Sequence, residues 1–168
     1  MPLRANWNGG ITVLSDSAVA SSPWAEANTV AKMSEDRIEM VKQLAAAWNR
    51  DDIDAFLDLL DPDVEWHTSI EPFFEGTESV FRGHDGIRQF WESYRGEAFE
   101  RLEVRIDEFR DLGESVLSLG EITTIGQASQ VQLTSELAQL WTFRGGKIVS
   151  SDDFLSHAEG LKAAGLRA

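Results

Sequence analysis

The sequence predicts one α+β domain from Ser34 to the C-terminus, preceded by an extension of residues 1–33. Three observations support this prediction. Apolar residues recur with helical spacing between residues 34 and 94, and they alternate with strand spacing between residues 102 and 154. A Gly-Gly pair separates the last two strand-like segments. Because the helical segments come before most of the strands, we expect helices packed on one antiparallel sheet and not alternating βαβ units.

The extension differs in composition from the rest of the chain. It contains a Ser/Ala-rich run from Ser15 to Ser22, and its charges sum to zero. We interpret residues 1–33 as a partly flexible extension. The alternative is a short strand at Ile11–Leu14 that docks on its own domain or on a partner.

Three segments have the spacing of amphipathic helices. The first is expected to begin at Ser34, whose side chain can cap a helix. The second is expected to begin at Asp51 or Asp52 and to end before Pro62, because proline cannot continue the hydrogen-bond ladder. The third opens with Gly83–Gly86. The apolar stripes of the three helices are Ile38, Val41, Leu44, Ala45 and Trp48; Ile53, Phe56, Leu57 and Leu60; and Ile87, Phe90, Trp91 and Tyr94.

Five segments have the character of strands, and the last two are joined by a hairpin turn at Gly145-Gly146. A loop containing Phe73 and Phe74 is expected between residues 72 and 82, and a short helix is expected at His157–Leu166. The predicted strands are 64–69, 102–109, 116–125, 131–143 and 147–154.

Composition excludes several classes of function. The net charge is −14, from 15 basic and 29 acidic residues, so the surface repels phosphate backbones and we expect no nucleic-acid partner. There are no cysteines, and the three histidines lack metal-ligand spacing, so we expect no metal site. We expect no cofactor, because no Gly-rich phosphate or dinucleotide motif occurs. Without a membrane-length apolar segment or a signal peptide, the sequence favours the cytoplasm and no membrane partner.

Four stretches carry a family resemblance, and they are Ala47–Ala55, Leu60–Trp66, Phe81–Trp91 and Leu140–Val149. Together they resemble the SnoaL-like branch of the nuclear transport factor 2-like (ketosteroid isomerase-like) superfamily. The resemblance implies a cone-shaped fold, in which three N-terminal helices close the wide side of a curved antiparallel sheet around a small-molecule pocket. It also implies a homodimer through the outer face of the sheet. It does not fix a reaction, since this fold hosts many activities.

Comparison with the ketosteroid isomerases of this superfamily implies a changed site. The motifs align Leu44 with the tyrosine donor of the isomerases, Gln139 with their late aspartic acid, and His67 at or beside their catalytic base. Leu44 cannot donate a hydrogen bond, so the isomerase oxyanion hole is incomplete and steroid isomerase activity is not expected.

Three residues are candidate catalytic groups. His67 ends a predicted strand, and a near-neutral imidazole is a versatile general acid or base. The alternative is a histidine that only hydrogen-bonds to the backbone. Glu121 and Asp153 lie on predicted strands between apolar residues, so either could orient His67 or act as an acid with a raised pKa. Each could instead be an exposed strand residue.

The candidate ligand-binding residues are mostly apolar. Gln139 shares a strand face with Trp141, and an amide among aromatic neighbours requires a hydrogen-bond partner. Trp48, Phe90 and Trp91 are predicted on helix faces, where they form either plain core or a pocket wall. Together with Leu44, these residues favour a flat apolar or aromatic ligand.

The sequence therefore predicts a SnoaL-like small-molecule enzyme that uses cofactor-independent acid/base chemistry. Its substrate would be a small apolar carbonyl- or hydroxyl-bearing compound, and the reaction would be of the isomerase, cyclase, dehydratase or hydrolase type. A non-catalytic ligand-binding or accessory protein of the same fold is the alternative. A structural dimerisation module, with its cavity filled by side chains, is a third interpretation.

Overall fold

The computed structural model describes residues 23–69 and 79–167. The chain divides into two compact units, residues 1–33 and residues 34–168, which we describe separately. Helix α1 runs from Pro23 to Asn49 and contributes to both units. The prediction that this helix begins at Ser34 is therefore wrong. Residues 23–33 open with a proline and contain good helix formers, which favour continuation of the helix toward the N-terminus.

Within the first unit, the described residues are the exposed start of α1. Trp24 is 68% exposed, and Val30 and Met33 are also exposed. The strand considered at Ile11–Leu14 lies outside the described residues.

The described residues of the second unit contain four further helical segments. They are α2 (Ile53–Asp58), α3 (Gly83–Trp91), the π-helix η3 (Glu92–Ala98) and α4 (His157–Ala163). The side chain of Asp52 caps α2 by accepting a hydrogen bond from the amide of Ala55 at 3.0 Å, as the sequence predicts. The predicted third helix changes into η3 before it reaches Tyr94.

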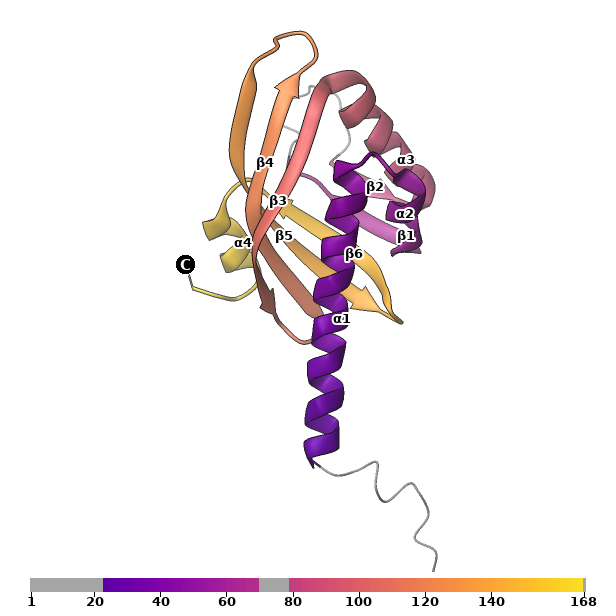
Figure 1. Ribbon diagram of the computed structural model, residues 1–168, viewed down its shortest axis with the longest axis vertical. Coiled ribbons are helices and arrows are strands. Elements are labelled where there is room, and N and C mark those ends of the chain that lie inside the picture. The colour runs from indigo at the N-terminus through magenta and orange to yellow at the C-terminus, as the bar shows by residue number, and fades with distance from the viewer. Residues whose placement is uncertain (1–22, 70–78, 168) are drawn as a thin grey trace, which may run out of the picture. The chain divides into compact units, whose positions relative to one another are not determined.

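The strands form one six-stranded sheet in the order β2-β1-β6-β5-β4-β3. All neighbouring pairs are antiparallel except β1 and β6, which run parallel. Their bounds are Leu60–His67 (β1), Val80–Arg82 (β2), Phe99–Asp111 (β3), Ser115–Gly126 (β4), Gln132–Arg144 (β5) and Lys147–Phe154 (β6). The predicted α+β class, with helices packed on a curved sheet, is confirmed (Figure 1).

The first two strands differ from the sequence prediction. β1 begins at Leu60 and includes Pro62, whereas we expected a strand only from Val64. β2 lies inside the predicted loop, and Phe73 and Phe74 lie outside the described residues. The predicted hairpin at Gly145-Gly146 is confirmed, with φ values of 59° and 75° that suit glycine.

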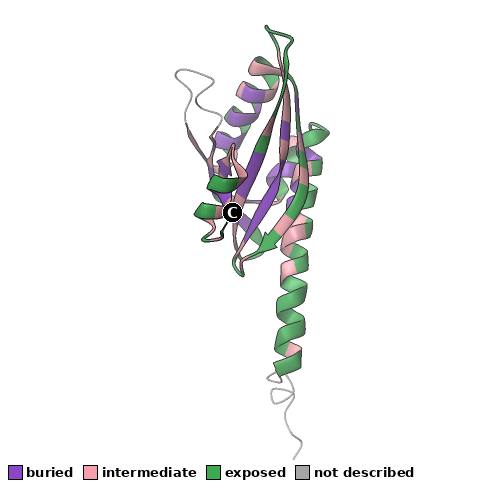
Figure 2. Ribbon diagram, turned by 90° about the vertical axis from the view of Figure 1, so that its left-hand side faces the viewer, coloured by how far each residue is buried: buried purple, intermediate pink, exposed green. Residues whose placement is uncertain are grey.

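The two faces of the sheet bury different clusters. The inner face packs against α1, α2 and α3 through an aromatic-rich core that includes Trp48, Trp66 and Trp141. The outer face of β4 and β5 packs against α4 through a smaller cluster around Leu117 and Ala138. Figure 2 shows the buried residues concentrated on the strands and on the helices that face them. Along β5, residues therefore alternate between a side that faces the main core and a side that faces α4 or solvent.

No helix in residues 23–69 or 79–167 has both the length and the apolar character needed to span a membrane.

Candidate ligand pocket

A small cavity lies between α1 and the inner face of the sheet. Its volume is about 40 Å³, which is room for about three water molecules at about 10–15 Å³ each. Six of the predicted site residues line it, and they come from α1, α3, β5 and β6. These residues are Leu44, Trp48, Phe90, Gln139, Trp141 and Asp153.

Asp153 supplies the carboxylate of this cavity. This residue is 5% exposed, and its side chain accepts three hydrogen bonds. Oδ1 accepts from Nε2 of Gln139 at 3.0 Å and from Oγ of Ser151 at 3.0 Å. Oδ2 accepts from Nε1 of Trp66 at 2.9 Å. Register explains the cluster, because Gln139 pairs with Asp153 across β5 and β6, and both side chains point to the inner face.

Burial raises the pKa of Asp153 from 3.8 to about 6. The hydrogen bonds from Gln139, Ser151 and Trp66 oppose this change by stabilising the ionised form, and the nearby charge of Asp152 adds to the increase. None of the three donors is a cation. Asp153 is therefore a carboxylate held by neutral donors in an apolar cavity, with a pKa close to neutrality.

The hydrogen bonds leave Asp153 with acceptor capacity. A carboxylate offers about four lone-pair positions, and the donors from the described residues take two on Oδ1 and one on Oδ2. Oδ2 is therefore the oxygen that has room for a proton from a ligand.

The walls of the cavity are aromatic and aliphatic. Trp66 contacts Phe90 and Trp141 at ring-centroid distances of 5.5 and 5.4 Å, and Trp48 lies 5.5 Å from Phe90. Phe56 also lines the cavity, between Trp48 and Trp66. Such a lining favours a ligand that is mostly apolar, with its polar atoms directed at a few fixed groups.

His67 does not line this cavity. It lies on β1 beside Trp66, and alternation directs it away from the inner face that Trp66 occupies. Its Nε2 lies 3.4 Å from a carboxylate oxygen of Glu65, and its side chain is 38% exposed. The structure therefore does not bring His67 and Asp153 together in one site, contrary to our expectation.

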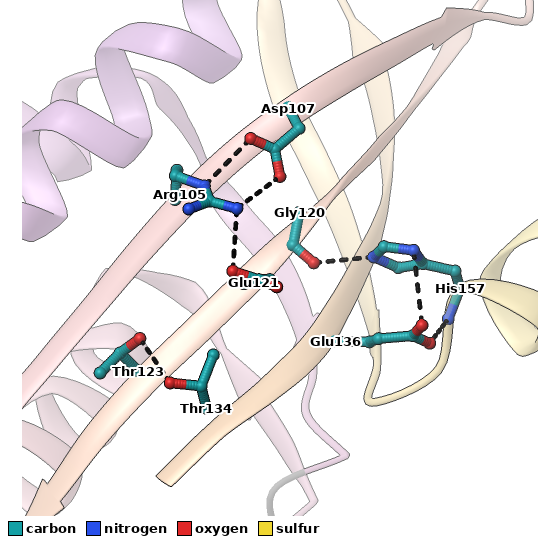
Figure 3. Close-up of polar contacts among 8 residues, drawn as sticks. All are labelled: Arg105, Asp107, Gly120, Glu121, Thr123, Thr134, Glu136 and His157. Carbon is teal, nitrogen blue, oxygen red and sulfur yellow. Dashed lines mark hydrogen bonds and ion pairs between the residues drawn. The ribbon is translucent and has the colours of Figure 1, made fainter. Parts of the chain in front are cut away.

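Glu121 is also separated from the cavity. It lies on the outer face of β4 and pairs with Nη2 of Arg105 at 2.9 Å, and its side chain is 42% exposed (Figure 3). The same arginine pairs with Asp107 at 3.0 Å. Glu121 thus belongs to a solvent-facing charge network. This is the alternative interpretation from the sequence, in which Glu121 is an exposed strand residue.

Trp91 is part of the core beside the cavity but does not line it. Its ring lies 4.7 Å from that of Trp48, and its Nε1 donates to Asp51 at 2.8 Å. Trp91 therefore packs against Trp48, which lines the cavity, and does not line the cavity itself.

Trp66 is the most important pocket residue that the sequence analysis missed. A signal was present, because apolar Val64 and Trp66 alternate with polar Glu65 and His67 over the predicted strand. That alternation predicts Trp66, and not His67, on the buried face. Phe56 and the aliphatic residues of β3 to β5 carried no comparable signal beyond being apolar.

Replacing Trp66 with Phe should raise the pKa of Asp153 above its present value of about 6. The change removes a donor to the ionised carboxylate, and we expect an increase of about one pH unit. The ¹³C resonance of the carboxyl group, followed through a pH titration, measures it. Trp91→Phe is the matched control, because its N–H serves Asp51, and an equal effect of both variants would contradict the assignment.

No group of three or more His, Asp or Glu side chains within the described ranges is placed to hold a metal ion. The polar groups of the cavity are one carboxylate and neutral donors, which suit proton transfer to or from an organic ligand.

Comparison with known proteins gives the family. Residues 41–151 match the SnoaL-like domain. A protein of unknown function from Burkholderia pseudomallei, described as NTF2-like, has 25% identity and a TM-score of 0.64, covering 76% of this chain and 95% of its own.

Two further solved structures share the fold. TerC, co-crystallised with polyporic acid, has 23% identity and a TM-score of 0.64, and the match covers 77% of this chain and 98% of TerC. A putative polyketide cyclase from Xanthomonas campestris has 17% identity and a TM-score of 0.61, covering 78% of this chain and 98% of its own. No protein with a curated description matches the chain. Because the family match spans more than half of the sequence, this chain belongs to the SnoaL-like domain family.

Proposed function

We propose that this protein is a small-molecule enzyme of the SnoaL-like type in which Asp153 is the general acid/base. It acts without a cofactor on a small, mostly apolar carbonyl- or hydroxyl-bearing compound. The observation that carries the proposal is the buried carboxylate of Asp153 in an aromatic cavity, with a pKa of about 6. A general base is most effective when its pKa lies near the working pH.

The geometry suits removal of a proton from carbon next to a carbonyl group. In that step the C–H bond breaks, the proton moves to Oδ2 of Asp153, and the electron pair moves onto the carbonyl oxygen. Return of the proton to another atom completes an isomerisation, and the same first step serves cyclisation and dehydration. Gln139 and Trp66 hold the carboxylate in place while it changes charge.

His67 is not assigned a role in this proposal, because it lies outside the cavity. Asp153 takes the role that the sequence suggested for the histidine. The sequence left open whether Gln139 bonds to the ligand or to a neighbouring side chain; its amide donates to Asp153, and we assign it the role of a positioning residue.

A ligand-binding protein without catalysis is the second candidate. Leu44 favours it, since this residue lines the cavity and offers no donor to a developing oxyanion. The small volume also favours it, because about 40 Å³ leaves little room for a second reactant. Self-association as a homodimer and a cytoplasmic location are further parts of the proposal, and the predicted acidic surface is compatible with both.

Exchange of the α-protons of cyclopentanone in D₂O tests the catalytic proposal. We expect the protein to accelerate exchange, followed by ¹H NMR, and Asp153→Asn to lower the acceleration by about 100-fold, the lower end of a general-base contribution. The exchange rate should rise with pH through a midpoint near the Asp153 pKa of about 6, because only the ionised form accepts a proton.

His67→Gln is the matched control and should leave exchange unchanged, since this side chain faces away from the cavity. Saturation-transfer NMR measures cyclopentanone binding by both variants. Binding without acceleration by the unmodified protein would favour the non-catalytic candidate. Equal acceleration by Asp153→Asn would contradict the role of Asp153.

A further inference from the structure

The cavity comes closest to solvent between α1 and β3. Two of the residues that line it, Ala45 on α1 and Val104 on β3, are half-buried, whereas the other residues that line it are buried. Asn49 lies one helical turn after Ala45 on the same side of α1, and its side chain contacts Val104. The partly exposed edge of the cavity is therefore the line where Ala45 and Asn49 meet Val104, which we call the α1–β3 seam.

The side-chain amide of Asn49 bridges this seam with two hydrogen bonds to one residue. Its Nδ2 donates to the carbonyl oxygen of Val104 at 2.7 Å, and its Oδ1 accepts from the backbone amide of Val104 at 2.9 Å. β3 is an edge strand of the sheet, so the backbone groups of Val104 that face away from β4 are available to a side chain. Asn49 thus satisfies this part of the edge as a further strand would.

The walls of the cavity differ in how they are joined. β3, β4, β5 and β6 are joined by backbone ladders, which open only when several hydrogen bonds break together. Side chains join α1 to β3. Besides the Asn49 bridge, Arg37 pairs with Asp111 at 3.9 Å, and Nζ of Lys42 lies 5.7 Å from the ring centroid of Phe109. None of these four residues lines the cavity, so the bridge from Asn49 is the tie that adjoins it.

The size of the cavity requires one of its walls to move. A volume of about 40 Å³ is room for about three water molecules, which is less than an organic ligand with a carbon ring needs. The α1–β3 seam is the part of the wall that lies nearest to solvent and crosses no backbone ladder. Separation of α1 from β3 at this point breaks two hydrogen bonds of an exposed side chain, and water can replace both of them.

We propose that ligands enter the cavity through the α1–β3 seam and that Asn49 is the latch that limits their entry. The inference rests on the proposed small-molecule pocket and adds the route of the ligand. In the closed state Asn49 holds Val104, and in the open state both groups bond to water while α1 moves away at Ala45. Because the same opening serves entry and release, Asn49 governs both rates and not the affinity. The route favours flat ligands, since a thin molecule needs the smallest separation.

A reversible block of the seam tests the route. The chain has no cysteine, so one introduced thiol is a unique site for methyl methanethiosulfonate. Xenon occupies apolar cavities, and saturation-transfer ¹²⁹Xe NMR measures its exchange with solvent. Modification of Ala45→Cys should slow this exchange by about tenfold, because the added group crowds the seam, and dithiothreitol should restore it. Modification of Ala46→Cys, at an exposed position on the same turn of α1, should have no effect.

Asn49→Ala tests the latch. It removes both hydrogen bonds and leaves every residue that lines the cavity in place, so xenon exchange should become about tenfold faster. The affinity for xenon should change by less than about twofold, because entry and release accelerate together. Gln43→Ala is the matched control, since it removes the same kind of amide from an exposed position of α1 that does not line the cavity.

Three outcomes overturn the inference. The first is unchanged xenon exchange in Asn49→Ala, and the second is equal acceleration by Asn49→Ala and Gln43→Ala. The third is equal slowing by the modified Ala45→Cys and Ala46→Cys variants. Weaker xenon binding with unchanged exchange rates would assign Asn49 a structural role in place of a latch.

The xenon measurements do not depend on catalysis, because xenon has no hydrogen to donate. Faster xenon exchange in Asn49→Ala without α-proton exchange of cyclopentanone supports this inference and contradicts catalysis by Asp153. Catalysed α-proton exchange together with unchanged xenon exchange in Asn49→Ala contradicts this inference alone.

Discussion

Acidification from about pH 7 to about pH 4 should raise the free energy of unfolding of the protein by about 2–3 kcal/mol relative to that of Asp153→Asn. The reason is the pKa of Asp153, which burial raises from 3.8 to about 6 in the folded state. Between these values the folded protein holds a proton that the unfolded chain has released. Stability therefore falls as the pH rises from about 4 to about 6 and is level above the folded pKa.

Urea unfolding at a series of pH values, followed by tryptophan fluorescence, measures this difference. Asp153→Asn also lowers the free energy of unfolding for a second reason, because the NH₂ group of Asn cannot accept the hydrogen bond from Trp66. That decrease is the same at every pH. All other titrating groups are common to both proteins and cancel in the comparison. The diagnostic quantity is therefore the pH dependence of the difference in unfolding free energy between the unmodified protein and Asp153→Asn.

A second variant makes the test sharper. Trp66→Phe removes a donor to the ionised carboxylate, so it should widen the pH interval over which stability is lost. If the free energies of unfolding of the unmodified protein and of Asp153→Asn changed with pH in parallel, Asp153 would ionise at its ordinary pKa in the folded state. That outcome would also remove the main support for Asp153 as a general base near neutral pH.

The sequence was sufficient for most of the fold because its local signals and its tertiary packing agree. Asp52 caps α2 as predicted, and Gly145-Gly146 forms the turn between β5 and β6. Helical and alternating periodicities locate the remaining elements, since each reflects which side chains must be buried. These are local properties, and neighbours in the chain determine them.

The features that sequence did not reveal depend on contacts between distant segments. The parallel pairing of β1 with β6 places Leu60 beside Ile148 and draws Pro62 into a strand that proline alone would not predict. The change from α3 to the π-helix η3 likewise has no local signature in the sequence. Both are selected by packing and not by residue preference.

The candidate site was predictable in part. Gln139 and Asp153 were expected on strands near apolar residues, and register then places them side by side at 3.0 Å. His67 was expected in the cavity from its aligned position, although alternation with Trp66 already favoured the opposite face. The donor from Trp66 to Asp153 joins residues far apart in the chain, so no local pattern could predict it.

Gly120→Ala should be strongly destabilising, by about 3 kcal/mol or more. A Cβ at this position would lie 1.9 Å from the carbonyl oxygen of Arg105 and 2.8 Å from its carbonyl carbon. These are backbone atoms of β3, which pairs with β4 through Ile106 and Gly120 next to a register shift. A side chain can rotate away from a clash, whereas these atoms can move only by breaking the ladder between β3 and β4.

Gly96→Ala is the matched control, because a Cβ there meets no atom within 4 Å. Gly96 lies in η3, where alanine is favoured over glycine, so this variant should be neutral or more stable by up to about 1 kcal/mol. Thermal or urea unfolding of both variants measures the contrast. The displacement in Gly120→Ala should also disturb α4, because Nε2 of His157 donates to the carbonyl of Gly120 at 2.7 Å (Figure 3). Equal stabilities of the two variants would show that β3 and β4 can separate at the register shift without loss, and would contradict the close approach of their backbones.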